Sequence, residues 1–171
     1  MAGSLVLIQE TTVSSATASV TLTGIDSTYD VYMVTINNAV PTVDNTFNMR
    51  TTTSGTADSD SQYDVAHKIL KANTSFANDT NTNGTQWKIA STVGTDTNEQ
   101  TNHIIYLFNF NNASEFSFFT NENAKLNSSA VLEGFQGGGV HTVAEANDGV
   151  NFFVVSGNIE AGTFKLYGLV K

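Results

Sequence analysis

The chain has 171 residues and a formal net charge of −9, from seven lysines and arginines against sixteen aspartates and glutamates. A field of this sign repels phosphate backbones and anionic membrane surfaces, so we expect no nucleic-acid partner and no membrane partner. The sequence has no cysteine, which excludes disulfides and thiolate metal sites. Because only 13% of the residues are charged, the polar surface must consist largely of Thr, Asn and Ser.

The length fits a single domain over residues 1–171, and no repeat or change in composition divides it. Residues 1–4 carry no basic side chain, and the apolar run at residues 5–8 is too short for a signal peptide. No stretch approaches the length of a membrane span. We therefore expect a protein that is made in the cytoplasm.

Alternating apolar and polar residues indicate strands in the first part of the chain. Residues 17–23 predict a half-buried strand, because Val20 and Leu22 alternate with serine and threonine. Residues 29–36 are apolar on both faces, which is typical of a central strand. Shorter strands are expected at residues 47–50, 87–90 and 140–144.

Three polar or ambiguous segments follow. Residues 64–71 permit a helix or a strand, because Val65, Ile69 and Leu70 fit one helical stripe while the segment is short enough for a strand. This alternative stays open. Residues 51–61 and 73–85 are dense in Thr, Ser, Asn, Asp and Gly, which compete for backbone hydrogen bonds, and they predict surface loops.

Apolar and aromatic residues alternate again through residues 103–120. They would share one face of a hairpin with the loop 111–114: Ile104, Tyr106, Phe108, Phe110, Phe116 and Phe118. We expect this face to be the centre of the core. Truncation of Phe108 or Phe118 to alanine would then cost about 3–5 kcal/mol.

Residues 150–171 contain two apolar runs around a glycine-containing loop, which predicts a second hairpin. Phe164 and Leu166 would face inward, because they alternate with residues that can face outward. About ten short strands with polar turns and almost no helix predict an all-β fold. The expected architecture is an antiparallel β-sandwich, jelly-roll-like in its topology.

The sequence predicts no catalytic, cofactor-binding or metal residues, and no enzymatic activity. His67, His103 and His141 are far apart and lack the spacing of a zinc helix, so they are interpreted as surface or half-buried residues on strands. The glycine-rich segment 134–139 lacks the Gly-Lys-Ser/Thr ending of a phosphate loop. Its glycines are expected to allow positive φ or close packing.

Two features permit carbohydrate chemistry without requiring it. Glu115, Glu133 and Glu160 could contribute a carboxylate pair for sugar hydrolysis, but we interpret them as solvated strand or turn ends. Trp87 and Tyr167 could stack on sugars, whereas packing in the core or at its rim is the more common role of single aromatic residues.

The acidic segment around Asp58, Asp60 and Asp64 leaves calcium as an open option. Oxygen-rich loops of this kind can hold the ion. The EF-hand pattern fails here, because the glycine at its sixth position and the glutamate at its twelfth are absent. A melting temperature that does not respond to added calcium would exclude the option.

Two segments resemble a known group of proteins. Residues 24–32, with the sequence GIDSTYDVY, and residues 156–168, with the sequence SGNIEAGTFKLYG, resemble small β-rich structural proteins of tailed bacteriophages, especially those of marine bacteria and cyanobacteria. The match covers both ends of the chain, and the middle is similar only in style. The resemblance implies a virion component without catalytic residues, such as a capsid decoration, tail or fibre protein.

The leading hypothesis is a capsid decoration, or cement, protein located in the virion. Homotrimers at local symmetry axes would bridge capsomers, and many modest contacts would together stabilise the shell. Its partners would be copies of itself and the major capsid protein or another virion protein. The alternative is a tail-fibre or receptor-binding head domain that binds host surface glycan. A carbohydrate enzyme is a third hypothesis, without a catalytic grouping to support it.

Overall fold

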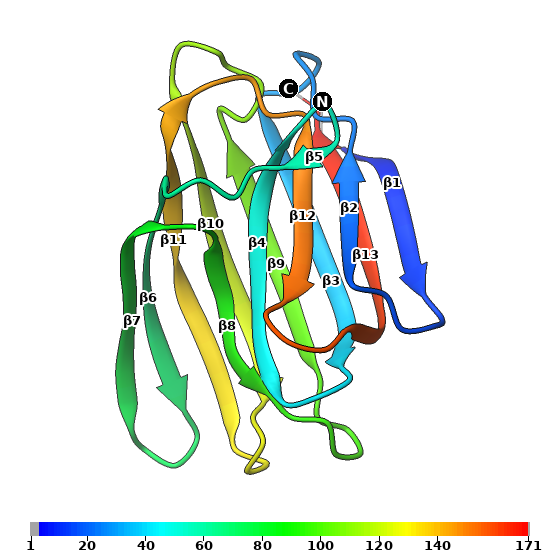
Figure 1. Cartoon of the computed structure of the whole chain (residues 1–171), viewed down its shortest axis with the longest axis vertical. Helices are drawn as coiled ribbons and strands as arrows, with labels where there is room; N and C mark the ends of the chain where they lie inside the picture. Colours follow the sequence, from blue (N-terminus) through cyan, green and yellow to red (C-terminus); the bar gives the residue numbers. More distant parts are fainter. Residues whose placement is uncertain (1–3, 171) are drawn as a thin grey trace.

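A computed structural model describes residues 4–170, which form two antiparallel β-sheets packed face to face (Figure 1). The strands are β1 (Leu5–Val13), β2 (Ser19–Thr23), β3 (Val31–Pro41), β4 (Asn45–Thr53), β5 (Thr56–Ala57), β6 (Tyr63–Lys71), β7 (Phe76–Gly84), β8 (Trp87–Val93), β9 (Thr101–Phe108), β10 (Phe116–Leu126), β11 (Leu132–Ala144), β12 (Gly149–Val154) and β13 (Ile159–Leu169). The large sheet has the order β1-β13-β3-β9-β10-β11-β6-β7. The small sheet has the order β2-β12-β4-β5, and β8 pairs with β4.

The predicted all-β antiparallel sandwich is confirmed. The described residues form 13 strands rather than about ten, and the jelly-roll topology is not confirmed. Within residues 4–170 no helix is long and apolar enough to cross a membrane.

The predicted C-terminal hairpin is wrong, because β12 and β13 belong to different sheets. β12 lies between β2 and β4, whereas β13 lies between β1 and β3. Their connection crosses from the small sheet to the large one through Gly157, whose φ of 82° suits glycine. Phe152 and Phe164 meet across the sandwich with ring centroids 5.6 Å apart, so the two strands form opposite walls of one core.

The hairpin of β9 and β10 is confirmed, with Phe108 opposite Phe118, but its buried face is the opposite of the predicted one. Ile104 is 45% exposed, Tyr106 37% and Phe118 45%, and Phe110 is the one buried member of the predicted aromatic face. The buried residues are instead Ile105, Leu107 and Phe119. Both faces of β9 are apolar, so alternation alone could not choose between them.

The structure also decides the predictions for β6, β3 and β7. Residues 64–71 form the strand β6, and β3 is an interior strand between β13 and β9, as predicted. The loop prediction for residues 73–85 is wrong, because β7 pairs with β6 as an edge strand. Its polar composition suggested a loop, but the side chains of a largely exposed edge strand need not be apolar.

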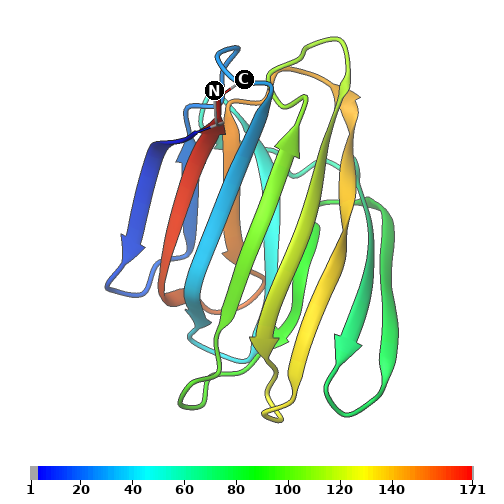
Figure 2. The ribbon, with the colours of Figure 1, turned by 180° about the vertical axis from the view of Figure 1, so that it is seen from behind.

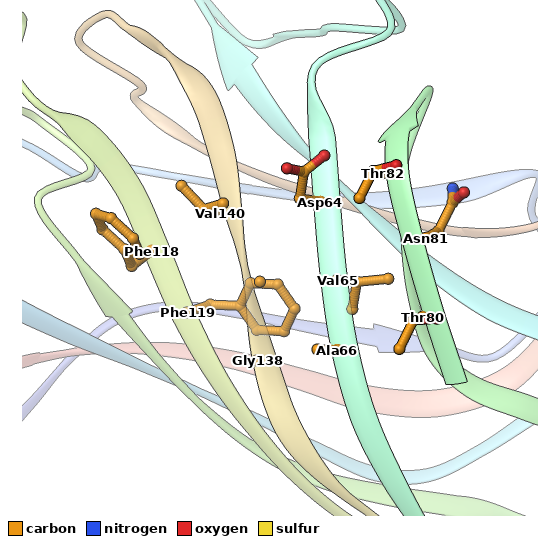
Figure 3. A pocket seen from close by; sticks show the side chains of 11 residues that line it. Asp64, Val65, Ala66, Thr80, Asn81, Thr82, Phe118, Phe119, Gly138 and Val140 are labelled. Carbon is orange, nitrogen blue, oxygen red and sulfur yellow. The ribbon is translucent and has the colours of Figure 1, made fainter. Parts of the chain in front are cut away.

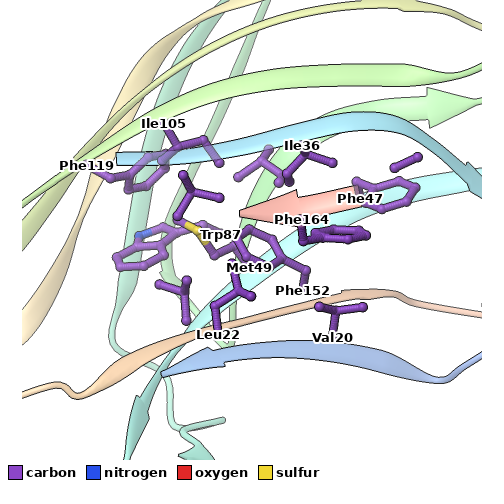
Figure 4. Close-up of a cluster of buried hydrophobic side chains, with 14 of the residues drawn as sticks. Val20, Leu22, Ile36, Phe47, Met49, Trp87, Ile105, Phe119, Phe152 and Phe164 are labelled. Atoms are coloured by element: carbon purple, nitrogen blue, oxygen red, sulfur yellow. The ribbon is translucent and has the colours of Figure 1, made fainter. Parts of the chain in front are cut away.

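One hydrophobic cluster fills the space between the sheets (Figure 4). Trp87 of β8 packs on Phe119 of β10 with ring centroids 4.7 Å apart and meets Tyr63 of β6 edge-on at 4.9 Å. Phe164 and Leu166 are fully buried, which confirms that they face inward. Buried aromatic pairs of this kind contribute beyond the area they bury, so β8 anchors the small sheet on the large one.

Candidate functional site

The outer face of the large sheet, which is turned toward the viewer in Figure 2, carries several exposed apolar side chains. Strand register places Leu7, Tyr167, Met33 and Tyr106 side by side across four strands. A shallow cavity of about 210 Å³ opens beside them. The name "outer apolar patch" is used below for the surface side chains Leu5, Leu7, Tyr106, Phe118 and Tyr167. Apolar surfaces of this kind are characteristic of interaction sites.

The edge strand β1 continues this patch to the border of the sheet. Leu5 is 51% exposed, Val6 38% and Leu7 50%. Edge strands of soluble monomers are usually protected by charge, by proline or by bulges. β1 has a register shift between Leu7 and Gln9, after the three exposed apolar residues, so these residues stay available for contact. The opposite edge, β7, is rich in Asn and Thr instead.

A transverse groove crosses β10, β11, β6 and β7 on the same face (Figure 3). Its volume is about 760 Å³. Small residues lie next to one another in register along it, with Gly138 opposite Ala66 and Ala66 opposite Thr80. Phe118 and Val140, which are also opposite one another, line one side. A Cβ at Gly138 would collide with the backbone of β10, so close packing requires glycine here.

Glu133 is not a solvated strand end, because it is only 2% exposed and its carboxylate is fully engaged. One oxygen pairs with Lys71 at 3.0 Å and accepts a hydrogen bond from Asn127, and the other pairs with Lys125 at 2.7 Å and accepts one from Ser91. Burial alone would raise the pKa of Glu133, but these partners together lower it to about 2. A carboxylate held in this way is a structural group rather than a general base.

All three histidines are buried, so the prediction that they lie at the surface or half-buried is wrong. His103 bonds through its Nδ1 atom to Asn121 at 3.0 Å and through its Nε2 atom to Thr101 at 2.8 Å. His67 is also buried, and neither of its ring nitrogens has a hydrogen-bond partner. Burial lowers the pKa of both imidazoles to about 4, so both are neutral at pH 7.

The third histidine joins two carboxylates near the end of β11. Asp58, His141 and Glu145 are the one group of three potential metal ligands among the residues that the structure describes, with ligand atoms within 4.8 Å of one another. Asp60 and Asp64, which were considered with Asp58 as possible calcium ligands, do not belong to this group. Glu145 was not among the predicted site residues, and its spacing of four residues from His141 was the available signal.

The remaining sequence candidates lie apart. Trp87 is fully buried and donates its indole N–H to the Val140 carbonyl at 3.2 Å, which confirms its packing in the core and excludes stacking on sugars. Tyr167 lies half-buried on the outer face. Glu115 and Glu160 are exposed, and they do not gather with Glu133 within the described part of the chain.

The structure thus places two surface features on one face of the large sheet, the outer apolar patch and the groove beside it. A third feature, the group of Asp58, His141 and Glu145, lies at one end of β11. Comparison of the chain with known protein families, with characterised proteins and with solved structures finds no match.

Proposed function

We propose that this chain is a structural protein of a phage virion, a capsid decoration or cement protein that acts without catalysis as a homotrimer. The outer apolar patch with its edge strand β1 carries the proposal, because it gives the fold a surface suited to contact with other chains. The resemblance of residues 24–32 and 156–168 to phage structural proteins supports the virion setting.

Removal of apolar surface from water drives this kind of contact, at about 25 cal/mol per Å². Leu5, Leu7 and Tyr106 offer such surface at the β1 side of the large sheet. Copies would pack these side chains against one another or against the major capsid protein. A modest free energy in each contact suffices, because contacts repeated over a shell add up through multivalency.

Substitution of Tyr106 by lysine tests the surface in solution. The wild-type protein is expected to sediment as a trimer, and Tyr106→Lys as a monomer, because a charge in the contact area must be desolvated when copies associate. Phe76→Lys is the matched control, since Phe76 is 64% exposed on β7, outside the patch. A wild-type protein that stays monomeric at all concentrations in sedimentation equilibrium would refute the homotrimer.

Electron microscopy of the purified virion tests the location. Regular density of the size of this protein on the capsid exterior is required for a decoration protein. Gold-labelled antibody confined to the tail would support the fibre alternative instead. Absence of the chain from purified particles would end the virion proposal in both forms.

Glycan binding by a tail-fibre or receptor-binding domain is the second candidate, and the groove beside Phe118 favours it. An exposed aromatic wall next to polar side chains such as Asp64 and Thr80 is a suitable surface for a sugar chain. The isolated protein would then bind host cells in competition with host polysaccharide, and Phe118→Ala would abolish this binding. Binding that is unaffected by Phe118→Ala would exclude the groove as the glycan site.

A further inference from the structure

The side chains of Asp58 and His141 are held in place by contacts with β6 and with the segment that precedes it. His141, on β11, is opposite Tyr63 in the register of β6, and the two rings lie with their centroids 4.8 Å apart. The Tyr63 hydroxyl donates to the backbone oxygen of Asp58 at 3.0 Å. The backbone N–H of Asp60 donates to Asp58 Oδ1 at 2.9 Å. The imidazole is fully buried, so its orientation is determined by packing.

The partners of His141 determine which ring nitrogen carries a proton in the neutral imidazole. Its Nε2 lies 3.2 Å from Asp58 Oδ2, and a carboxylate can only accept, so Nε2 is the donor. Nδ1 then presents a lone pair toward Glu145 Oε1, another acceptor. Both of these atoms are buried without a hydrogen-bond partner. Two acceptors that face each other in the interior are unfavourable unless a cation lies between them.

The separation of the two acceptors favours a metal ion over a proton. His141 Nδ1 and Glu145 Oε1 are 3.7 Å apart, whereas an N–H···O hydrogen bond spans about 2.7–3.2 Å. Two ligands that each lie about 2.0–2.1 Å from one zinc ion are about 3.3–3.4 Å apart at the tetrahedral angle and about 3.7 Å apart at an angle near 130°. We propose that His141 Nδ1 and Glu145 Oε1 bind a divalent transition-metal ion of the zinc class.

Asp58 completes the site as a positioning residue. A histidine that ligates a metal commonly donates its other ring N–H to a carboxylate, which orients the ring and increases the basicity of the ligand nitrogen. The bond from His141 Nε2 to Asp58 has this form. A pocket of about 370 Å³ lined by Asp58, Asp60 and Glu145 lies beside these side chains, and water in it would complete the coordination of the ion.

The proposed site draws on both sheets through its positioning residue. Asp58 follows β5 of the small sheet directly, whereas His141 belongs to β11 of the large sheet. Metal binding would therefore stabilise the folded chain, and this role does not depend on the assembly function proposed above.

Thermal unfolding with and without Zn²⁺, after treatment with a chelator, tests the site. At about 100-fold excess over Kd, Zn²⁺ is expected to raise the Tm of the wild-type protein by about 5–10 °C. Glu145→Gln should unfold without metal at a Tm equal to or above that of the wild type, because the amide can donate to the free Nδ1. Its Zn²⁺ response should be lost. Co²⁺ should give visible absorption bands with the wild type and none with Glu145→Gln.

Glu160→Gln is the matched control. It removes the same negative charge from an exposed carboxylate elsewhere, so it should keep the full response to Zn²⁺ and Co²⁺. A wild-type protein without any Zn²⁺ response would overturn the proposal, as would a response of equal size in Glu145→Gln.

Discussion

Replacement of Phe119 by alanine is expected to lower the free energy of unfolding by about 3–5 kcal/mol. Phe119 is 2% exposed and packs between the sheets, with its ring centroid 4.7 Å from that of Trp87 and 6.2 Å from that of His67. Truncation removes most of this contact and leaves a cavity that β8 cannot close, because Trp87 is fixed by its other neighbours. Urea unfolding should show a lower midpoint at an unchanged slope.

Phe118→Ala is the control, on the same strand and one residue earlier. Phe118 points to the outer face and is 45% exposed, so its loss should cost less than about 1 kcal/mol. Both variants are best measured in a Tyr106→Lys background, in which association does not contribute to stability. If Phe118→Ala destabilised the protein more than Phe119→Ala, the assignment of the two faces of the large sheet would be wrong.

The contrast between these two residues shows where alternation predicts a buried face and where it does not. In β2 and β13 the apolar residues alternate with threonine, lysine or other residues that can face solvent. Val20, Leu22, Phe164 and Leu166 are buried as predicted. In β9 both faces are apolar. Such a strand has no preferred register on sequence grounds, and an exposed interaction face gives the same pattern as a core face.

The local sequence could not predict which strands pair with each other. The apolar runs of β12 and β13 suit a hairpin and also suit two strands in different sheets, and the choice depends on β2, β3 and β4, which lie far earlier in the chain. β7 is a strand because β6 offers it a free edge, not because its own residues favour extended structure.

The candidate sites were harder to predict from the sequence than the strand pairing. Asp58 and His141 are 83 residues apart, and they meet only because β5 and β6 bring Asp58 to the end of β11. The apolar residues Leu5 and Leu7 were visible in the sequence, but their meaning depends on β1 being an edge strand, which is a property of the strand order. The glutamate assigned to solvent, Glu133, is buried because two lysines and two neutral donors surround it.

Loss of the charge on Glu133 is expected to destabilise the fold by about 3–5 kcal/mol, because Glu133→Gln leaves the ammonium of Lys125 buried without its counter-ion. The Lys125 side chain is fully buried, and its other partner is the Thr92 carbonyl at 2.7 Å. Burial lowers the pKa of Lys125 in spite of the ion pair, so desolvation already opposes its charge. Lys125→Met with Glu133→Leu should cost less than the sum of the two single changes, because no unpaired charge remains between these positions.

The same pair predicts how stability depends on pH. The pKa of Glu133 is about 2 in the folded state and near 4.5 in the unfolded chain. The stabilisation from this lowered pKa is therefore complete above about pH 4.5. It is lost as the pH falls toward 2, because the unfolded state takes up the proton first. Urea unfolding of the wild type between pH 7 and pH 3 should show this loss, and Glu133→Gln should show a shallower dependence from a lower starting stability. Parallel curves for the two proteins would mean that the carboxylate is not held ionised by its buried partners.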